Sequence, residues 1–100
     1  MTYERSLDAL ADSTRRLLLQ ELARGPQSVS ALAQRLPVSR PAVSQHLKAL
    51  KEADLATDTA EGTRRIYRIN PQGLEALRQW LDAFWDTAMQ NLKDEAREDD

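Results

Sequence analysis

Between residues 39 and 51, polar and basic side chains recur at the spacing of one helix face. Arg40, Gln45 and Lys48 fall on this face, and the stretch holds three basic residues and no acidic one. Arginine can bond guanine through two hydrogen bonds, glutamine suits adenine, and lysine neutralises phosphates. The pattern predicts a DNA-binding helix. Its candidate contact residues are Ser39, Arg40, Pro41, Ala42, Ser44, Gln45, Lys48 and Lys51.

A second basic element follows in the sequence. Arg64 and Arg65 lie beside Gly62, and Arg68 comes shortly after them. Arginines at a hairpin tip can reach phosphates or an adjacent minor groove. Each basic element alone also fits a simpler interpretation, either a solvated helix face or arginines that protect a strand edge. Two such elements in succession favour DNA contact, and we predict that Arg64 and Arg65 take part in it.

The single histidine, His46, lies between Val43 and Leu47 on the first of these segments. Three interpretations are open: a DNA contact, a half-buried residue packed against the second helix or the turn, and a metal ligand. The sequence offers no companion ligands for the metal role. Packing is the interpretation that we favour.

Caps and breaks divide the chain into the elements that position these residues. Asp12, Ser28 and Ser39 are good N-caps, because their side chains accept the unpaired amides of a first helical turn. Gly25 fits a left-handed C-cap, and Asn70 before a proline opens the last helix. We predict helices over residues 4–11, 13–23, 29–36, 40–53 and 71–93, and strands over 55–59 and 64–69 joined by a turn over 60–63. The order α-α-α-α-β-β-α is mainly α with a small β-hairpin (α+β), a winged helix-turn-helix.

The last predicted helix carries more apolar surface than one small core needs. Leucines and aromatic residues recur along it at steps of three and four, and both tryptophans of the chain lie on it. Core packing should claim Leu74, Leu77 and part of Leu81. The remaining apolar surface of this helix predicts a dimer interface, formed together with the first helix. The interface residues are Tyr3, Leu7, Leu10, Trp80, Leu81, Phe84, Trp85 and Ala88. An effector pocket lined by Trp80, Phe84 and Trp85 is the weaker alternative.

The amino-acid composition excludes several classes of function. The chain has 100 residues, no cysteine, one histidine and three glycines. This length suits one domain, which we place over residues 1–93, followed by an acidic, disordered tail over residues 94–100. Thiolate metal sites, a glycine-rich phosphate loop and a catalytic set around the histidine are all excluded, so we expect no enzyme activity, cofactor or metal. No apolar run suits a membrane span or a signal peptide, so the expected compartment is the cytosol.

The net charge of −2 hides an uneven distribution. Residues 69–100 hold eight acidic and three basic residues, whereas the acid-free basic stretch lies far upstream. Mild overall acidity therefore does not exclude a nucleic-acid partner.

Four segments, in this order, resemble the ArsR (arsenical-resistance repressor) family of bacterial winged helix-turn-helix repressors. They are LDALADSTRR (7–16), SVSALAQRL (28–36), VSRPAVSQHLKAL (38–50) and GTRRIYRI (62–69), within a likeness over about residues 5–90. The resemblance implies a homodimer that binds a palindromic operator and represses transcription. It also implies that the helix over residues 40–53 reads bases and that the hairpin over residues 55–69 is the wing.

The sequence departs from the metal-sensing members of that family. Those members carry Cys-Val-Cys where this sequence has Ser28-Val29-Ser30, and others use Asp, His and Glu of a last helix that here lacks histidine. The resemblance is therefore to the cysteine-free subgroup without the metal-sensing motif, whose inducers are mostly undefined.

The expected partners are double-stranded DNA, a second copy of the chain, and a small-molecule or protein effector of unknown kind, with no membrane. The alternative function is a winged-helix protein-interaction module that does not bind DNA. Such a module would need neither the acid-free face of residues 39–51 nor an arginine-rich wing.

Overall fold

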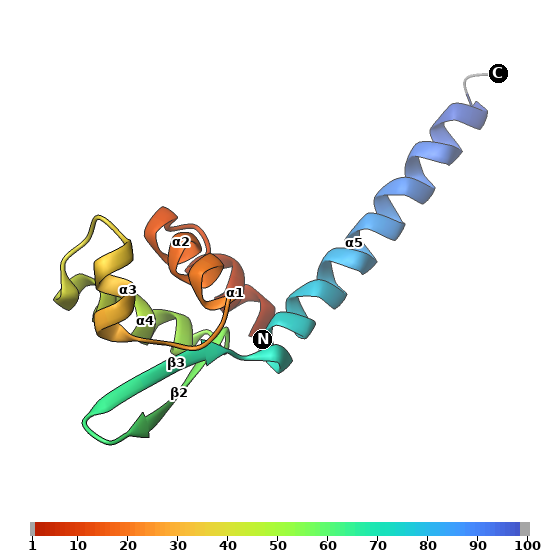
Figure 1. Cartoon of the computed structure of the whole chain (residues 1–100). Coiled ribbons are helices and arrows are strands. Elements are labelled where there is room, and N and C mark those ends of the chain that lie inside the picture. The colour runs from red at the N-terminus through yellow and green to blue at the C-terminus, as the bar shows by residue number, and fades with distance from the viewer. Residues whose placement is uncertain (1, 99–100) are drawn as a thin grey trace.

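Five helices and three strands make up residues 2–98, the part of the chain that the structure, a computed structural model, describes (Figure 1). They are α1 (Thr2–Ala9), α2 (Ser13–Leu22), β1 (Gln27–Ser28), α3 (Val29–Arg35), α4 (Arg40–Glu52), β2 (Ala56–Glu61), β3 (Arg64–Ile69) and α5 (Pro71–Glu98). The winged helix-turn-helix predicted from the sequence is confirmed. The structure adds one element, the two-residue strand β1.

The predicted N-caps are present, whereas the predicted C-cap at Gly25 is wrong: α2 has its C-cap at Ala23, and Gly25 lies two residues further on with a φ of +146°. Asp12 Oδ1 accepts hydrogen bonds from the N–H groups of Thr14 and Arg15, at 2.8 and 3.1 Å. The hydroxyls of Ser28 and Ser39 accept the amides of Ala31 and Ala42 at 3.1 and 3.3 Å. These caps fix where α2, α3 and α4 begin, and so fix which side chains face inward.

The strand β1 was not predicted from the sequence, and it changes the environment of the hairpin. β3 lies between β1 and β2 in an antiparallel sheet, with Ser28 paired to Ile66. Because β3 is the central strand, Ile66 and its neighbour Tyr67 are both buried although they point to opposite faces. Two residues are too few to give a strand period, so only this long-range pairing reveals β1.

The hairpin turn is tighter than the predicted turn over residues 60–63. β2 continues through Glu61 and β3 starts at Arg64, so Gly62 and Thr63 alone form the turn. Gly62 has a φ of +63°, a left-handed conformation that costs glycine little.

The core lies where α2, α3 and α4 meet the base of the hairpin. Its side chains are mostly aliphatic, and β3 contributes the ring of Tyr67. The fully buried leucines and valine are Leu18, Leu22, Leu32, Val43, Leu47, Leu50 and Leu55.

Helix α5 extends away from the core and makes the molecule elongated. Figure 1 shows it projecting well beyond the other elements, and the extents are 66 × 25 × 22 Å. The radius of gyration is 17.6 Å, against about 13 Å for a compact domain of this length. Of the three leucines assigned to the core, Leu77 is buried, whereas Leu74 and Leu81 are largely exposed. Over the described residues, no helix is both long enough and apolar enough to span a bilayer.

The predicted end of the last helix near Lys93 is too early. α5 continues through Glu98, so residues 94–98 of the expected disordered tail are helical, and the last two residues lie outside the described part. Neither glycine nor proline occurs after Gly73, and Gln90 Nε2 donates a hydrogen bond to Asp94 Oδ1 at 3.1 Å. Both features favour helix continuation.

The start of α5 is fixed by a close backbone approach. Gly73 is buried against Asp54, and a Cβ built on Gly73 would lie 1.7 Å from the Asp54 carbonyl oxygen. Asp54 itself has a φ of +63°, and the next residue, Leu55, accepts a 3.0 Å hydrogen bond from the Asn70 N–H. The direction of α5 is thus set where the end of α4 meets its first turn.

We predict that Gly73→Ala destabilises the fold by about 2 kcal/mol or more, because the methyl group meets backbone that cannot rotate away. Helix propensity alone would favour alanine by about 1 kcal/mol, so the sign of the effect tests the contact. Thermal unfolding measures it, with Gln72→Ala as the exposed neighbouring control. A melting temperature at or above that of the parent would contradict the close approach.

Candidate nucleic-acid interface

One face of α4 is fully buried and the other is open. Val43, Leu47 and Leu50 have no exposed surface, which fixes the rotation of the helix about its axis. Seven of the eight predicted contact residues are exposed on or beside the opposite face, and the eighth, Ala42, is half-buried. The exposed residues are Ser39, Arg40, Pro41, Ser44, Gln45, Lys48 and Lys51.

The N-terminal end of α4 is built to meet an anion. The turn between α3 and α4 packs Leu36 and Val38 against the core, and it presents Ser39 as the cap. The first turn carries Arg40 and no acidic residue. Unpaired N–H groups and the positive end of the helix dipole both favour a phosphate at such an end.

The arginines of the hairpin differ in what they contact. Arg64, at the turn, is exposed, and its side chain makes no hydrogen bond or ion pair within the described part of the chain. Arg65 Nη1 bonds Asp58 Oδ2 at 2.8 Å. Arg68 lies across the hairpin, where its Nη1 bonds Thr59 Oγ1 at 2.8 Å. Arg64 is therefore the arginine most available to a ligand at the tip.

Asp58, which the sequence analysis did not single out, connects α4 to the hairpin. Its Oδ1 lies 2.8 Å from Lys51 Nζ, and its Oδ2 lies 2.8 Å from Arg65 Nη1. Only 5% of its side chain is exposed. The hydrogen bond from Lys51 and then that from Arg65 hold the pKa of Asp58 below its usual value, against the opposing effect of burial. The single sequence signal was an acid among threonines and alanines in a strand just after a basic helix.

His46 packs against the start of α2. Its Nδ1 lies 4.0 Å from Asp12 Oδ1, and a quarter of its side chain is exposed. The packing interpretation is therefore the one that this geometry favours. The pKa of Asp12 is lowered chiefly by the hydrogen bond from the Arg15 N–H, with His46 a smaller influence.

The residues at the positions of the family's Cys-Val-Cys motif do not suit the metal binding of its metal-sensing members. Ser28 is buried and its hydroxyl is engaged as the cap of α3, and a neutral hydroxyl is a poor ligand for thiophilic metals. No group of three or more metal-ligating side chains comes together among the described residues.

The predicted dimer residues lie on α1 and α5, two helices that contact each other, except for Leu10, which directly follows α1. α1 packs against α5, and Leu7, Leu81, Phe84 and Trp85 are largely exposed. Leu10, Trp80 and Ala88 are half-buried, and the side chain of Tyr3 lies outside the described residues. The Trp80 and Phe84 rings stack with centroids 5.6 Å apart.

A helix-turn-helix whose second helix presents a basic face, followed by a basic hairpin, defines a winged helix-turn-helix DNA-binding protein. Residues 12–58 match the model of the bacterial regulatory protein, arsR family. The chain is 57% identical over 86 residues to the HTH-type transcriptional regulator Rv2034 of Mycobacterium tuberculosis, covering 86% of this chain and 80% of that protein. It therefore belongs to the ArsR family and is a transcriptional regulator.

Two further relatives bear on how such a chain works. The transcriptional repressor SdpR of Bacillus subtilis is 32% identical, with 76% of this chain and 84% of that protein covered. The solution structure of the homodimeric winged helix-turn-helix DNA-binding domain Mb0332 from Mycobacterium bovis superposes with a TM-score of 0.70 at 32% identity. That superposition covers 85% of this chain and 79% of Mb0332.

We predict that the Asp58 cluster makes stability depend on pH in the acid range. The folded pKa of Asp58 lies below its ordinary value of 3.8. Its stabilising effect is therefore complete above that value, and it is lost as pH falls through the lower folded value. The difference in free energy of unfolding between the parent and Asp58→Asn should shrink as pH falls below 3.8. Urea unfolding across this range measures it, and a difference independent of pH would contradict the ion pairs.

Proposed function

We propose that this regulator is a homodimeric repressor that binds a palindromic operator, with α4 in the major groove and the β2–β3 hairpin against the adjacent backbone. The observation that carries the proposal is the exposed face of residues 40–51 of α4, which is basic and holds no acidic residue, above a fully buried inner face. A helix held in this way presents the same side chains to every base step that it meets. The likeness to SdpR, itself named a repressor, supports the direction of regulation.

Within this face we assign two kinds of contact. Arg40 and Gln45 have the donors and acceptors to read base edges, and Ser44 between them is adaptable. Lys48 and Lys51 lie toward the C-terminal end of α4, where they would meet phosphates. Arg64 would reach the backbone or a narrow minor groove from the tip of the wing.

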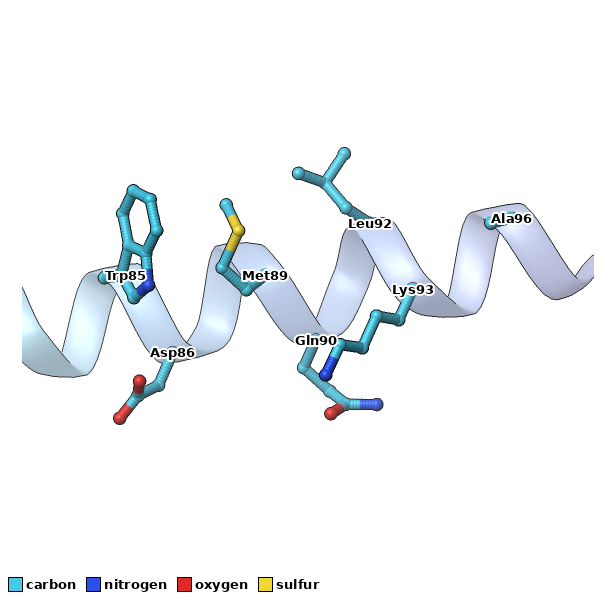
Figure 2. A pocket seen from close by; sticks show the side chains of 7 residues that line it. All are labelled: Trp85, Asp86, Met89, Gln90, Leu92, Lys93 and Ala96. Carbon is cyan, nitrogen blue, oxygen red and sulfur yellow. The ribbon is translucent and has the colours of Figure 1, made fainter.

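The distal half of α5 is the reason for proposing a dimer. Figure 2 shows Trp85, Met89 and Leu92 along one side of the helix, while Asp86 and Gln90 point elsewhere. A hollow of about 710 Å³ lies over this surface, and every residue that lines it belongs to α5. Such a hollow has one wall only, so it is an open helix face rather than a ligand cavity. A second copy of the chain supplies the missing wall.

A two-fold dimer through this face would also satisfy the geometry of DNA. Two recognition helices bind one face of a duplex when they lie about 34 Å apart, one helical turn. α5 is 28 residues long, about 42 Å at the usual rise, which is enough to act as the spacer. The homodimeric state of Mb0332 supports this arrangement.

The competing function is a winged helix that binds protein instead of DNA. It predicts that affinity for DNA is weak and depends little on salt concentration. The proposed interface predicts a steep one, because each neutralised phosphate contributes a slope of about −0.9 in log K against log salt. Binding to a random duplex at several salt concentrations therefore separates the two functions.

We predict opposite signatures for two neighbouring substitutions on α4. Gln45→Ala should cost about 1–3 kcal/mol on a duplex selected by the parent chain from genomic fragments, and should relax its preference at one base pair. Lys48→Ala should weaken binding to selected and random duplexes alike, and should lower the salt slope by about one. Fluorescence anisotropy titrations give both quantities. If Gln45→Ala binds both duplexes as the parent does, α4 does not read bases through this residue.

We predict that Trp85→Asp yields a folded monomer with weak affinity for the selected duplex, because the charge falls in the middle of the apolar face. Coupling two half-sites raises affinity through effective concentration, and a monomer loses this gain. Asn91→Asp places the same charge elsewhere on α5 and should leave the dimer intact. Sedimentation at micromolar concentration checks both variants. A parent chain that sediments as a monomer yet binds fully would refute the dimer.

A further inference from the structure

Asp58 places a negative charge between the two basic elements assigned to DNA. Its carboxylate oxygens lie 2.8 Å from Lys51 Nζ and 2.8 Å from Arg65 Nη1. Its side chain is only 5% exposed, whereas about half of each basic side chain faces solvent. A carboxylate here opposes the attraction of phosphates, so its contribution to binding must be geometric.

Strand register explains how the three side chains meet. Asp58 pairs with Tyr67 across the hairpin, and Ala60 pairs with Arg65. Side chains alternate along a strand, so Asp58 and Arg65 share the hairpin face that continues from the buried ring of Tyr67. The last turn of α4 packs against β2 and brings Lys51 to the same place.

We propose that Asp58 is a positioning residue of the DNA interface, which fixes the wing to the end of α4 so that both reach one duplex. This proposal rests on DNA binding by the face assigned above. Strand β1 pairs with the hairpin only at Tyr67 and Ile66, so the part beyond Ile66 is two-stranded, and a two-stranded hairpin is marginally stable alone. The ion pairs supply a fixed attachment at that point.

Both basic residues keep the capacity to bind DNA while they hold Asp58. An ammonium group has three N–H donors and a guanidinium has five, so the bonds to Asp58 leave donors on Lys51 and Arg65 for phosphates. About half of each side chain stays exposed, and Lys51 lies one helical turn after the exposed Lys48 on α4. Asp58 thus orders two phosphate contacts in advance of binding.

Ordered phosphate contacts matter more for a specific site than for random DNA. Phosphate contacts fix the register in which a recognition helix meets base edges, whereas loosely placed charges bind any duplex. Releasing Lys51 and Arg65 should therefore strengthen indiscriminate binding and weaken discrimination. A residue that only stabilised the fold would change both affinities in the same direction.

The test compares Asp58→Asn with Glu61→Gln, which removes the same charge from the exposed end of the same strand. Two probes of about 30 base pairs are used: a random-sequence pool, and the duplex that the parent chain enriches from it. For Asp58→Asn we expect the ratio of the two affinities to fall roughly tenfold, and the salt slope on random DNA to steepen by about one. For Glu61→Gln we expect slightly tighter binding to both probes and an unchanged ratio.

Thermal unfolding of each variant precedes the titrations. If Asp58→Asn does not fold, Asp58→Glu keeps the charge but displaces its partners by one methylene, and its ratio should also fall. An unchanged ratio in a folded Asp58 variant, or the same fall in Glu61→Gln, overturns the positioning role. A parent chain that binds neither probe, or binds both without salt dependence, instead refutes the DNA interface itself.

Discussion

The burial of one face of α4 is the constraint on which the rest of the molecule depends. Val43, Leu47 and Leu50 are completely enclosed, and each contributes roughly 2 kcal/mol by leaving water. Leucines of α2 and α3 provide the opposing surface, and the three N-caps set the starting points of these helices. Rotation of α4 by one residue would place a lysine in the core. The residues that α4 exposes are therefore determined by the residues that it buries.

The hairpin and α5 are attached to the far end of that same helix. Leu55 follows α4 and is fully buried, Asp54 turns the chain in a left-handed conformation, and Gly73 packs directly on that turn. The hairpin and α5 thus diverge from one small junction, so an error there would misplace both. This explains why the junction combines a positive φ, a glycine without space for a Cβ, and a backbone hydrogen bond from Asn70 to Leu55.

Local chemistry in the sequence predicted the elements well, and long-range contacts account for what it missed. Caps, breaks and apolar spacing are local, and they located every helix and both hairpin strands to within a few residues. The strand β1 and the close approach at Gly73 each depend on a partner far away in the chain. The ion pairs of Asp58 join it to residues seven positions away on either side, and they form only because α4 packs against the hairpin. The end of α5 was misjudged because acidic residues were interpreted as a solvated tail, whereas residues 95–98 are Glu, Ala, Arg and Glu, which are all good helix formers. Outward residues of α4 followed directly from its buried ones.

The distribution of charge reconciles an acidic chain with a DNA-binding face. The exposed acids of the distal α5, such as Asp82, Asp86 and Asp94, lie on the arm that projects away from the wing, at the other end of a molecule 66 Å long (Figure 1). At physiological ionic strength the Debye length is about 8 Å, so charges that far from a bound duplex are screened from it. The acidic residues of α5 therefore have little electrostatic effect at the basic face. The net negative charge of the chain still opposes unspecific association between chains. Asp58 lies between Lys51 and Arg65, and these two cations, each with a nitrogen within 3 Å of its carboxylate, largely neutralise it.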